Sequence, residues 1–177
     1  MRWFPRKTEQ LSDGMAAAGG YRFRSADGRF EVEIPAVPLR AMVGHAAASG
    51  WQTETGGILI GRYKDGHRTA SILEVTGPPA GSSWGRTWFR RGGGDIDALL
   101  ELRWRQGIYY LGEWHTHPNG TPYPSADDLR TMQRISAQPS YACPEPILVI
   151  LGGRSTDWQL NAVILADGNP IVMMPSM

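Results

Sequence analysis

Runs of hydrophobic residues, some alternating with polar ones and some continuous, divide the chain into predicted strands and helices. The segment RFEVEI alternates with the period of a half-buried strand, and Asp27-Gly28 in front of it is a turn signal. Residues 21–35 therefore predict a β-hairpin. The apolar runs TGGILIGRY and PILVILGG predict buried strands. Further strands are expected in TASILEVTGPP, IYYLGEWHTH, DWQLNAVILAD and PIVMMP.

Three segments carry helical patterns and helix-ending signals. Residues 36–50 place Pro38 in a first turn and Gly50 at the C-terminal end. Residues 95–107, DIDALLELRWRQG, and residues 125–138, SADDLRTMQRISAQ, both have amphipathic helical periods. Because hairpins and helices are mixed without repeated βαβ units, we predict an α/β (α+β) fold, a mixed β-sheet flanked by helices.

Length and cysteine content bound the organisation of the chain. Its 177 residues suit one domain with a hydrophobic core. The alanine- and glycine-rich stretch MAAAGG follows a polar N-terminal segment. We expect an N-terminal tail over residues 1–19 and a single domain over residues 20–177. Cys143 is the single cysteine, so an intrachain disulfide is excluded and a reducing compartment is favoured.

Charge and hydropathy argue against two classes of partner. The formal net charge of +1 offers no bulk electrostatic attraction for nucleic acid or for an anionic membrane. The longest aliphatic run, ILVIL, is too short to cross a bilayer, and the basic N-terminus lacks the apolar core of a secretory signal. We therefore expect a cytoplasmic protein that binds neither membrane nor nucleic acid.

The stretch GEWHTHPNGTPYPSADD, residues 112–128, carries the candidate chemistry. His115 and His117 are two residues apart at a predicted strand end, so their side chains point to the same face. Ser125 and Asp128 are three residues apart and share one face of a first helical turn. Two histidines and an aspartate form a three-ligand set that leaves a fourth tetrahedral position for water, as in a catalytic zinc site.

A water activated by a metal still needs a proton acceptor. Glu54 is the best candidate, because Gly56 and Gly57 after it allow another backbone to approach closely. Ser125 could then donate a hydrogen bond to a developing oxyanion. The alternative is structural: Ser125 and Asp128 also fit a helix N-cap, and the histidines could be polar residues at a strand end. The joint spacing favours the metal site.

The order Glu, His-x-His, Ser-x-x-Asp resembles the motif of the JAMM (MPN+) zinc metalloproteases, and the likeness extends over roughly residues 30–165, including ETGGILIG and PILVILGG. The branch that it resembles is bacterial, found beside ubiquitin-like conjugation enzymes in anti-phage systems such as CBASS. The resemblance implies a cytidine-deaminase-like core and one Zn²⁺ per chain, held by His115, His117 and Asp128. It also implies that Glu54 acts as general acid and base and that Ser125 orients the water or stabilises the oxyanion.

The same resemblance implies a deubiquitinase-like isopeptidase that cleaves after the C-terminus of a ubiquitin-like modifier or of its conjugates. Its expected partners are that modifier, the conjugates, and activating-enzyme-like and conjugating-enzyme-like proteins encoded nearby. The segment SSWGRTWFRRGGG, residues 82–94, is a candidate wall of the substrate groove, in which Trp84, Trp88 and Phe89 would contact the modifier or would instead pack on the domain's own core. A RadC-like protein with a nucleic-acid-related role and a non-catalytic MPN binding module are the alternatives.

Overall fold

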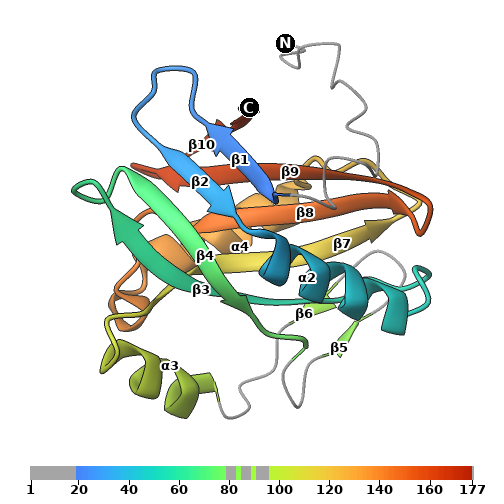
Figure 1. Ribbon diagram of the computed structural model, residues 1–177, viewed down its shortest axis with the longest axis horizontal. Coiled ribbons are helices and arrows are strands. Elements are labelled where there is room, and N and C mark those ends of the chain that lie inside the picture. Colours follow the sequence, from blue (N-terminus) through green and yellow to red (C-terminus); the bar gives the residue numbers. More distant parts are fainter. Residues whose placement is uncertain (1–18, 79–82, 85–88, 91–95, 177) are drawn as a thin grey trace.

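The computed structural model describes residues 19–78, 83–84, 89–90 and 96–176, and a large mixed β-sheet is its frame (Figure 1). Within these residues the strand order is β10-β9-β8-β7-β3-β4-β2-β1-β11. The β2–β4 and β7–β8 pairs are parallel and the other neighbouring pairs are antiparallel. In chain order the strands of this sheet are β1 (Tyr21–Arg24), β2 (Glu31–Ile34), β3 (Gly56–Lys64), β4 (Thr69–Val75), β7 (Tyr109–Pro118), β8 (Ile147–Arg154), β9 (Asp157–Ala166), β10 (Asn169–Val172) and β11 (Met174–Pro175).

The two ends of this strand order are joined by the chain itself. Strand β10 pairs with β9, whereas β11 pairs with β1, and only the buried Met173 lies between β10 and β11. The sheet must therefore curve until its first and last strands come together, and Figure 1 shows β10 beside β1. This curvature leaves an inner core that one helix can cover.

Helices pack on both faces of the sheet. Helix α2 (Ala36–Ala48) lies in front of the sheet in Figure 1, and α4 (Ala126–Ala137) lies behind it. The α2 side chains Leu39 and Met42 belong to one hydrophobic core, which contains Trp114 of β7. A second core contains Met132 and Ile135 of α4 together with Ile96 of α3 (Ile96–Trp104). Because successive side chains of a strand alternate in direction, the central strands contribute to both cores.

The predicted elements are confirmed within the described residues. The hairpin, the three helices and the buried strands lie where the patterns predicted them, and the fold class is the predicted mixed sheet flanked by helices. The predicted groove wall contains a two-stranded pair, β5 (Ser83–Trp84) with β6 (Phe89–Arg90), in which Trp84 is opposite Phe89. The predicted tail, apart from Gly19, and Trp88 lie outside the described residues.

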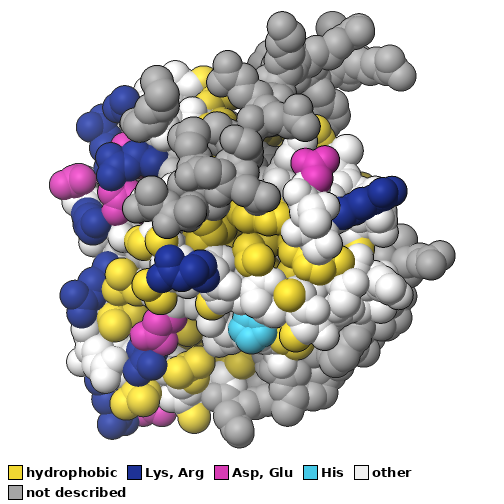
Figure 2. Space-filling view, turned by 45° about the vertical axis from the view of Figure 1, so that its right-hand side comes forward, with side chains coloured by type: hydrophobic (Ala, Val, Ile, Leu, Met, Phe, Trp, Pro, Cys, Tyr) yellow, Lys and Arg dark blue, Asp and Glu magenta, His cyan; other side chains and the backbone are white. Residues whose placement is uncertain are grey.

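Charged residues on the surface are mixed rather than segregated. On the face in Figure 2, basic and acidic side chains alternate along one margin, and hydrophobic side chains gather beside them. Ion pairs such as Arg22–Glu33 and Lys64–Glu33 are examples of this mixing. Among the described residues, no helix is long and apolar enough to cross a membrane.

Candidate metal centre

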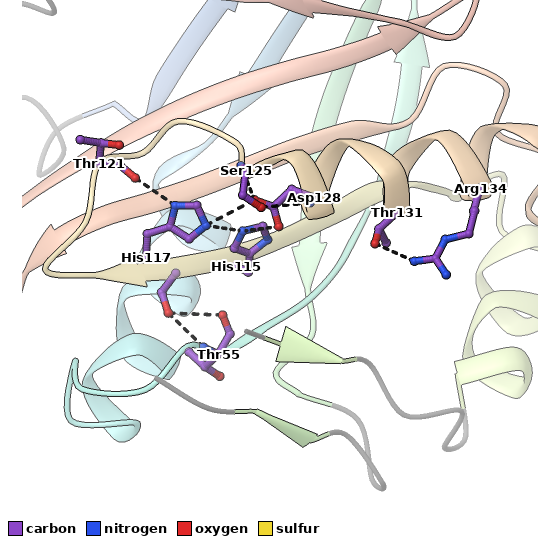
Figure 3. Close-up of polar contacts among 9 residues, drawn as sticks. Thr55, His115, His117, Thr121, Ser125, Asp128, Thr131 and Arg134 are labelled. Carbon is purple, nitrogen blue, oxygen red and sulfur yellow. Dashed lines mark hydrogen bonds and ion pairs between the residues drawn. The ribbon is translucent and has the colours of Figure 1, made fainter. Parts of the chain in front are cut away.

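Strand β7 brings the two histidines of the HTHP sequence to one face of the sheet. The Nε2 atoms of His115 and His117 are 2.9 Å apart, and His115 is buried with 7% of its surface exposed. Figure 3 shows both rings directed from β7 toward the beginning of α4. Thr116 lies between them in sequence, so its side chain points to the opposite face of the strand.

The first turn of α4 supplies the aspartate. Asp128 Oδ1 lies 3.4 Å from His115 Nε2, and Asp128 Oδ2 lies 3.5 Å from His117 Nε2. The same turn contains a capping box: the amide of Asp128 donates to Ser125 Oγ at 3.1 Å, and the amide of Ser125 donates to Asp128 Oδ2 at 2.6 Å. The cap and the candidate metal site were alternatives in the sequence, but here Asp128 takes part in both.

The three side chains are close enough together to share one cation. Zinc bonds to nitrogen and oxygen ligands measure about 2.0–2.2 Å, so tetrahedral geometry places neighbouring ligand atoms roughly 3.3–3.5 Å apart. The two histidine Nε2 atoms are 2.9 Å apart, and each lies 3.4 or 3.5 Å from a different oxygen of Asp128. One ligand atom from each of the three residues lies within 4.8 Å of the others, so small side-chain shifts would bring them around one zinc ion.

A backbone carbonyl selects the tautomer of His117. Its Nδ1 lies 3.0 Å from the carbonyl oxygen of Thr121, and because a carbonyl can only accept, Nδ1 carries the proton. The Nε2 lone pair of the neutral ring is then free to bind a cation. Such outer hydrogen bonds orient metal-binding histidines and make them better ligands. The role of Thr121 was not predicted from the sequence, because a backbone acceptor leaves no signal in residue type.

The charges of the site compensate one another. Burial would raise the pKa of Asp128, but the neighbouring His115 and His117 rings and the Ser125 side chain hold it well below its usual range. Burial lowers the pKa of His117, yet the hydrogen bond to Asp128 and the Thr121 carbonyl raise it overall. The ionised carboxylate therefore attracts positive charge to the histidines, and a divalent cation can replace protons there.

The backbone register of β3 on β7 carries Glu54 to the same site. Gly56 pairs with His115, and a Cβ on Gly56 would lie 2.3 Å from the Trp114 carbonyl oxygen, so only glycine allows this approach. Immediately before it, the Thr55 amide donates to Thr116 Oγ1 at 3.0 Å, and the Thr116 amide donates to the Thr55 carbonyl at 2.8 Å. This buried clamp, whose Thr55 is labelled in Figure 3, anchors the segment that carries Glu54.

Glu54 is a buried carboxyl group, with 7% of its surface exposed. Burial raises its pKa, the nearby histidines oppose that shift, and the Asp128 charge reinforces it. A carboxyl group with a raised pKa beside a candidate cation site is suited to moving protons near neutral pH. Of the catalytic candidates, Glu54 and Ser125 both lie at the three-ligand cluster.

Other predicted features lie elsewhere or stay untested. Trp84 and Phe89 belong to the β5–β6 pair, and their predicted contact with a modifier stays a prediction. The segment 137–146 contains a short 3₁₀ helix, η1 (Pro139–Tyr141), and the single cysteine, Cys143, which is buried and whose Sγ lies 3.9 Å from the Tyr63 hydroxyl. The Thr55–Thr116 clamp was also missed, because it joins residues 61 positions apart.

Comparison with known proteins gives three informative matches. Residues 35–162 match the family described as prokaryotic homologs of the JAB domain. A protein of Enterobacter hormaechei subsp. hoffmannii named "CD-NTase/cGAS isopeptidase" is 46% identical over 148 residues, which cover 83% of this chain and 82% of that protein. A probable metalloprotease of Sinorhizobium fredii is 30% identical over 143 residues, which cover 74% of this chain and 81% of the relative.

A solved structure shares the architecture. The solution structure of a protein from Desulfitobacterium hafniense has a TM-score of 0.53 at 19% sequence identity, and the match covers 77% of this chain and 86% of the other. At this identity the likeness concerns the fold alone. The matches to the two enzymes, in contrast, extend over most of the length of each relative.

Proposed function

Because the chain belongs to the prokaryotic homologs of the JAB domain, we propose that it is a zinc-dependent isopeptidase. Family membership, together with relatives named isopeptidase and probable metalloprotease, confirms the predicted JAMM-type hydrolase. The observation that carries the finer proposal is the convergence of the three ligand atoms beside a buried carboxyl group, Glu54.

In this proposal His115, His117 and Asp128 hold one Zn²⁺ per chain. Two imidazoles and a carboxylate are donors that suit zinc, and one ligand atom of each lies within 4.8 Å of the others. Zinc bound there would polarise the scissile carbonyl and lower the pKa of an attacking water to about 7. Asp128 balances the charge, and the Thr121 carbonyl keeps the Nε2 lone pair of His117 directed at the cation.

Glu54 and Ser125 perform the proton and charge steps. Glu54 takes the proton of the attacking water and passes it to the leaving amine as the carbon–nitrogen bond breaks, and its raised pKa suits both transfers. Ser125 Oγ accepts the Asp128 amide with a lone pair, and its O–H, which also contacts the Asp128 carboxylate, is the proposed donor to the oxyanion. Capping therefore leaves Ser125 able to act in the reaction.

The proposed substrate is an isopeptide bond between the C-terminal carboxyl of a ubiquitin-like modifier and a lysine amine. The relatives named CD-NTase/cGAS isopeptidase support a conjugate of a CD-NTase as the cleaved species. Activating-enzyme-like and conjugating-enzyme-like proteins would form the conjugate, in an anti-phage system. Residues 20–177 would act as one catalytic domain, with Trp84, Trp88 and Phe89 as proposed contacts of the modifier.

A cleavage assay with matched variants tests the proposal. The purified chain, loaded with one equivalent of zinc, is mixed with a CD-NTase conjugate, and the release of free modifier is followed by mass spectrometry. Glu54→Gln is expected to reduce cleavage by about 10²–10⁴-fold, the usual contribution of a general acid–base, while zinc content is unchanged. Glu101→Gln, at an exposed carboxylate on α3, is the control and should cleave like the wild type.

Zinc content supplies the second arm of the test. Elemental mass spectrometry should find one zinc per wild-type chain and none in Asp128→Ala. Wild-type protein that cleaves the conjugate after complete metal removal, or Glu54→Gln protein with full activity, would contradict the proposal.

A further inference from the structure

The carbonyl that orients His117 belongs to a tight turn, and that turn is supported by the end of strand β8. The amide of Gly120 donates to the His117 carbonyl at 3.0 Å, and one residue later the Thr121 carbonyl accepts from His117 Nδ1 at 3.0 Å. The turn is therefore hydrogen-bonded to His117, the residue whose ring it orients. The position of the turn relative to β7 depends on the part of β8 that packs against it.

Gly152 is the residue beneath the turn. It is the parallel partner of His117 in the β7–β8 pair, and it is buried. A Cβ placed on Gly152 would lie 2.4 Å from the Pro122 nitrogen, 2.5 Å from the Thr121 carbonyl carbon and 2.9 Å from the Gly120 carbonyl oxygen. All three are backbone atoms, so no flexible side chain could move aside. Any side chain at this position displaces the peptide that contacts His117.

The two residues after Gly152 fasten the same turn. The carbonyl of Gly153 accepts from the Asn119 amide at 2.8 Å, and Arg154 Nε donates to Asn119 Oδ1 at 3.0 Å. Asn119 has a φ of 60°, a left-handed conformation that asparagine tolerates better than most residues. The sequence Gly152-Gly153-Arg154 therefore forms a platform with a flat surface and two attachment points.

We propose that Gly152 is a positioning residue of the metal centre, which acts by letting the 119–122 turn lie on β8 so that the Thr121 carbonyl fixes the ring of His117. The inference rests on the proposed zinc site, which it deepens by naming its support. Gly152 touches neither metal nor substrate. Its effect is expected to appear in the tautomer of His117 and, through it, in zinc affinity.

Zinc affinity of the purified chain, measured by competition with a chromophoric chelator, is the first readout. Gly152→Ala is expected to weaken zinc binding by about 10–100-fold, the usual effect of losing an outer-sphere partner of a metal-binding histidine. Gly61→Ala is the matched control. A Cβ there would lie 2.1 Å from the Ser71 carbonyl oxygen, an equally severe clash, but at the Tyr109 end of β7. It should lower the melting temperature and leave zinc affinity unchanged.

The tautomer of His117 is the second readout, and it needs no metal. In ¹⁵N-detected imidazole spectra of metal-free protein at pH 8.5, wild-type His117 is expected as the Nδ1–H tautomer. Gly152→Ala should shift it toward the Nε2–H form. His117→Gln identifies the signal among the four histidines of the chain. A wild type that binds no zinc would refute the proposed metal site, while this spectrum would still decide the role of Gly152.

If Gly152→Ala does not fold, two exposed arginines decide the question. Arg154→Ala breaks the attachment to Asn119, whereas Arg134→Ala on α4 removes the same charge but breaks a bond to Thr131, away from the turn. Zinc binding several-fold weaker in Arg154→Ala than in Arg134→Ala would support the platform. Equal affinities of these two variants would overturn the inference, as would wild-type affinity with an unchanged His117 tautomer in Gly152→Ala.

Discussion

Substitutions at Ser125 can separate its structural contribution from its proposed catalytic one. The hydroxyl oxygen caps α4 by accepting the Asp128 amide at 3.1 Å. Replacing a serine N-cap by alanine costs about 1 kcal/mol, whereas glycine costs only a few tenths. For a protein of this size, about 1 kcal/mol corresponds to a melting-temperature shift of roughly 2–4 °C. Metal-free Ser125→Ala should therefore melt about 2–4 °C lower than wild type, and Ser125→Gly about 1 °C lower or less.

The effects of these substitutions on kcat should not follow their effects on melting temperature. Both substitutions remove the O–H that is proposed to donate to the oxyanion, and losing one such donor typically lowers kcat by about 10²–10³-fold. Ser125→Thr keeps the cap and the hydroxyl and should retain both stability and most of the activity. The measurements are calorimetric melting of metal-free protein and kcat of the zinc-loaded variants on the same conjugate, with zinc content checked in each.

The comparison of alanine with glycine is decisive. If Ser125 acts in the reaction, Ser125→Gly loses nearly as much kcat as Ser125→Ala, although its stability is close to that of the wild type. A kcat for Ser125→Gly near the wild-type value would show that the hydroxyl serves only as a helix cap, and the proposed oxyanion role would then be wrong.

Three further predictions concern residues around the site and the core. Thr116→Val removes the hydroxyl that accepts the buried Thr55 amide at 3.0 Å, so the unfolding free energy from urea titration should fall by about 1–3 kcal/mol. The kcat should also fall, because Glu54 is displaced, whereas the zinc content should be unchanged. Burial raises the pKa of the Cys143 thiol to about 11, so at pH 8 a disulfide reagent should label the native protein at least about 100-fold more slowly than the urea-unfolded chain; equal rates would show that the thiol is exposed. Burial lowers the pKa of His45, so the unfolded chain binds the extra proton below its unperturbed pKa of about 6.5, and the contribution of this histidine to stability falls from pH 7 to pH 5; the melting temperature of His45→Gln relative to that of the wild type should therefore rise as the pH is lowered over this range.

Local sequence patterns were sufficient to predict the strands and helices, the shared direction of the two histidines and the beginning of the helix at Ser125. The alternation in residues 21–35 and the apolar run at 147–153 predicted strands because the direction of a side chain in a strand depends only on its position. For the same reason, the spacing of His115 and His117 was enough to place both rings on one face. The helix beginning at Ser125 was equally local, because capping involves residues only three positions apart.

The sequence favoured a metal site over a helix cap, but it could not show that the same residues do both. Ser125 and Asp128 fit both a cap and a metal site, and the choice depended on where α4 lies relative to β7. The structure shows that the first turn of α4 is directed at the histidines, so the Asp128 carboxylate closes the capping box and also approaches both Nε2 atoms. A carboxylate has two oxygens with several lone pairs, which is why one side chain can do both.

The rest of the site was decided by the tertiary structure. Glu54 reaches the cluster because β3 pairs with β7 in the register that sets Gly56 against His115, and strand register depends on packing across the whole sheet. The Thr121 carbonyl and the Gly152 platform depend on the parallel pairing of β7 with β8. The sequence thus determined which side chains could hold a metal, because that depends on residue type and short spacing. Only the fold decided which backbone groups and which distant carboxyl group stand around them, because non-local pairing brings those atoms together.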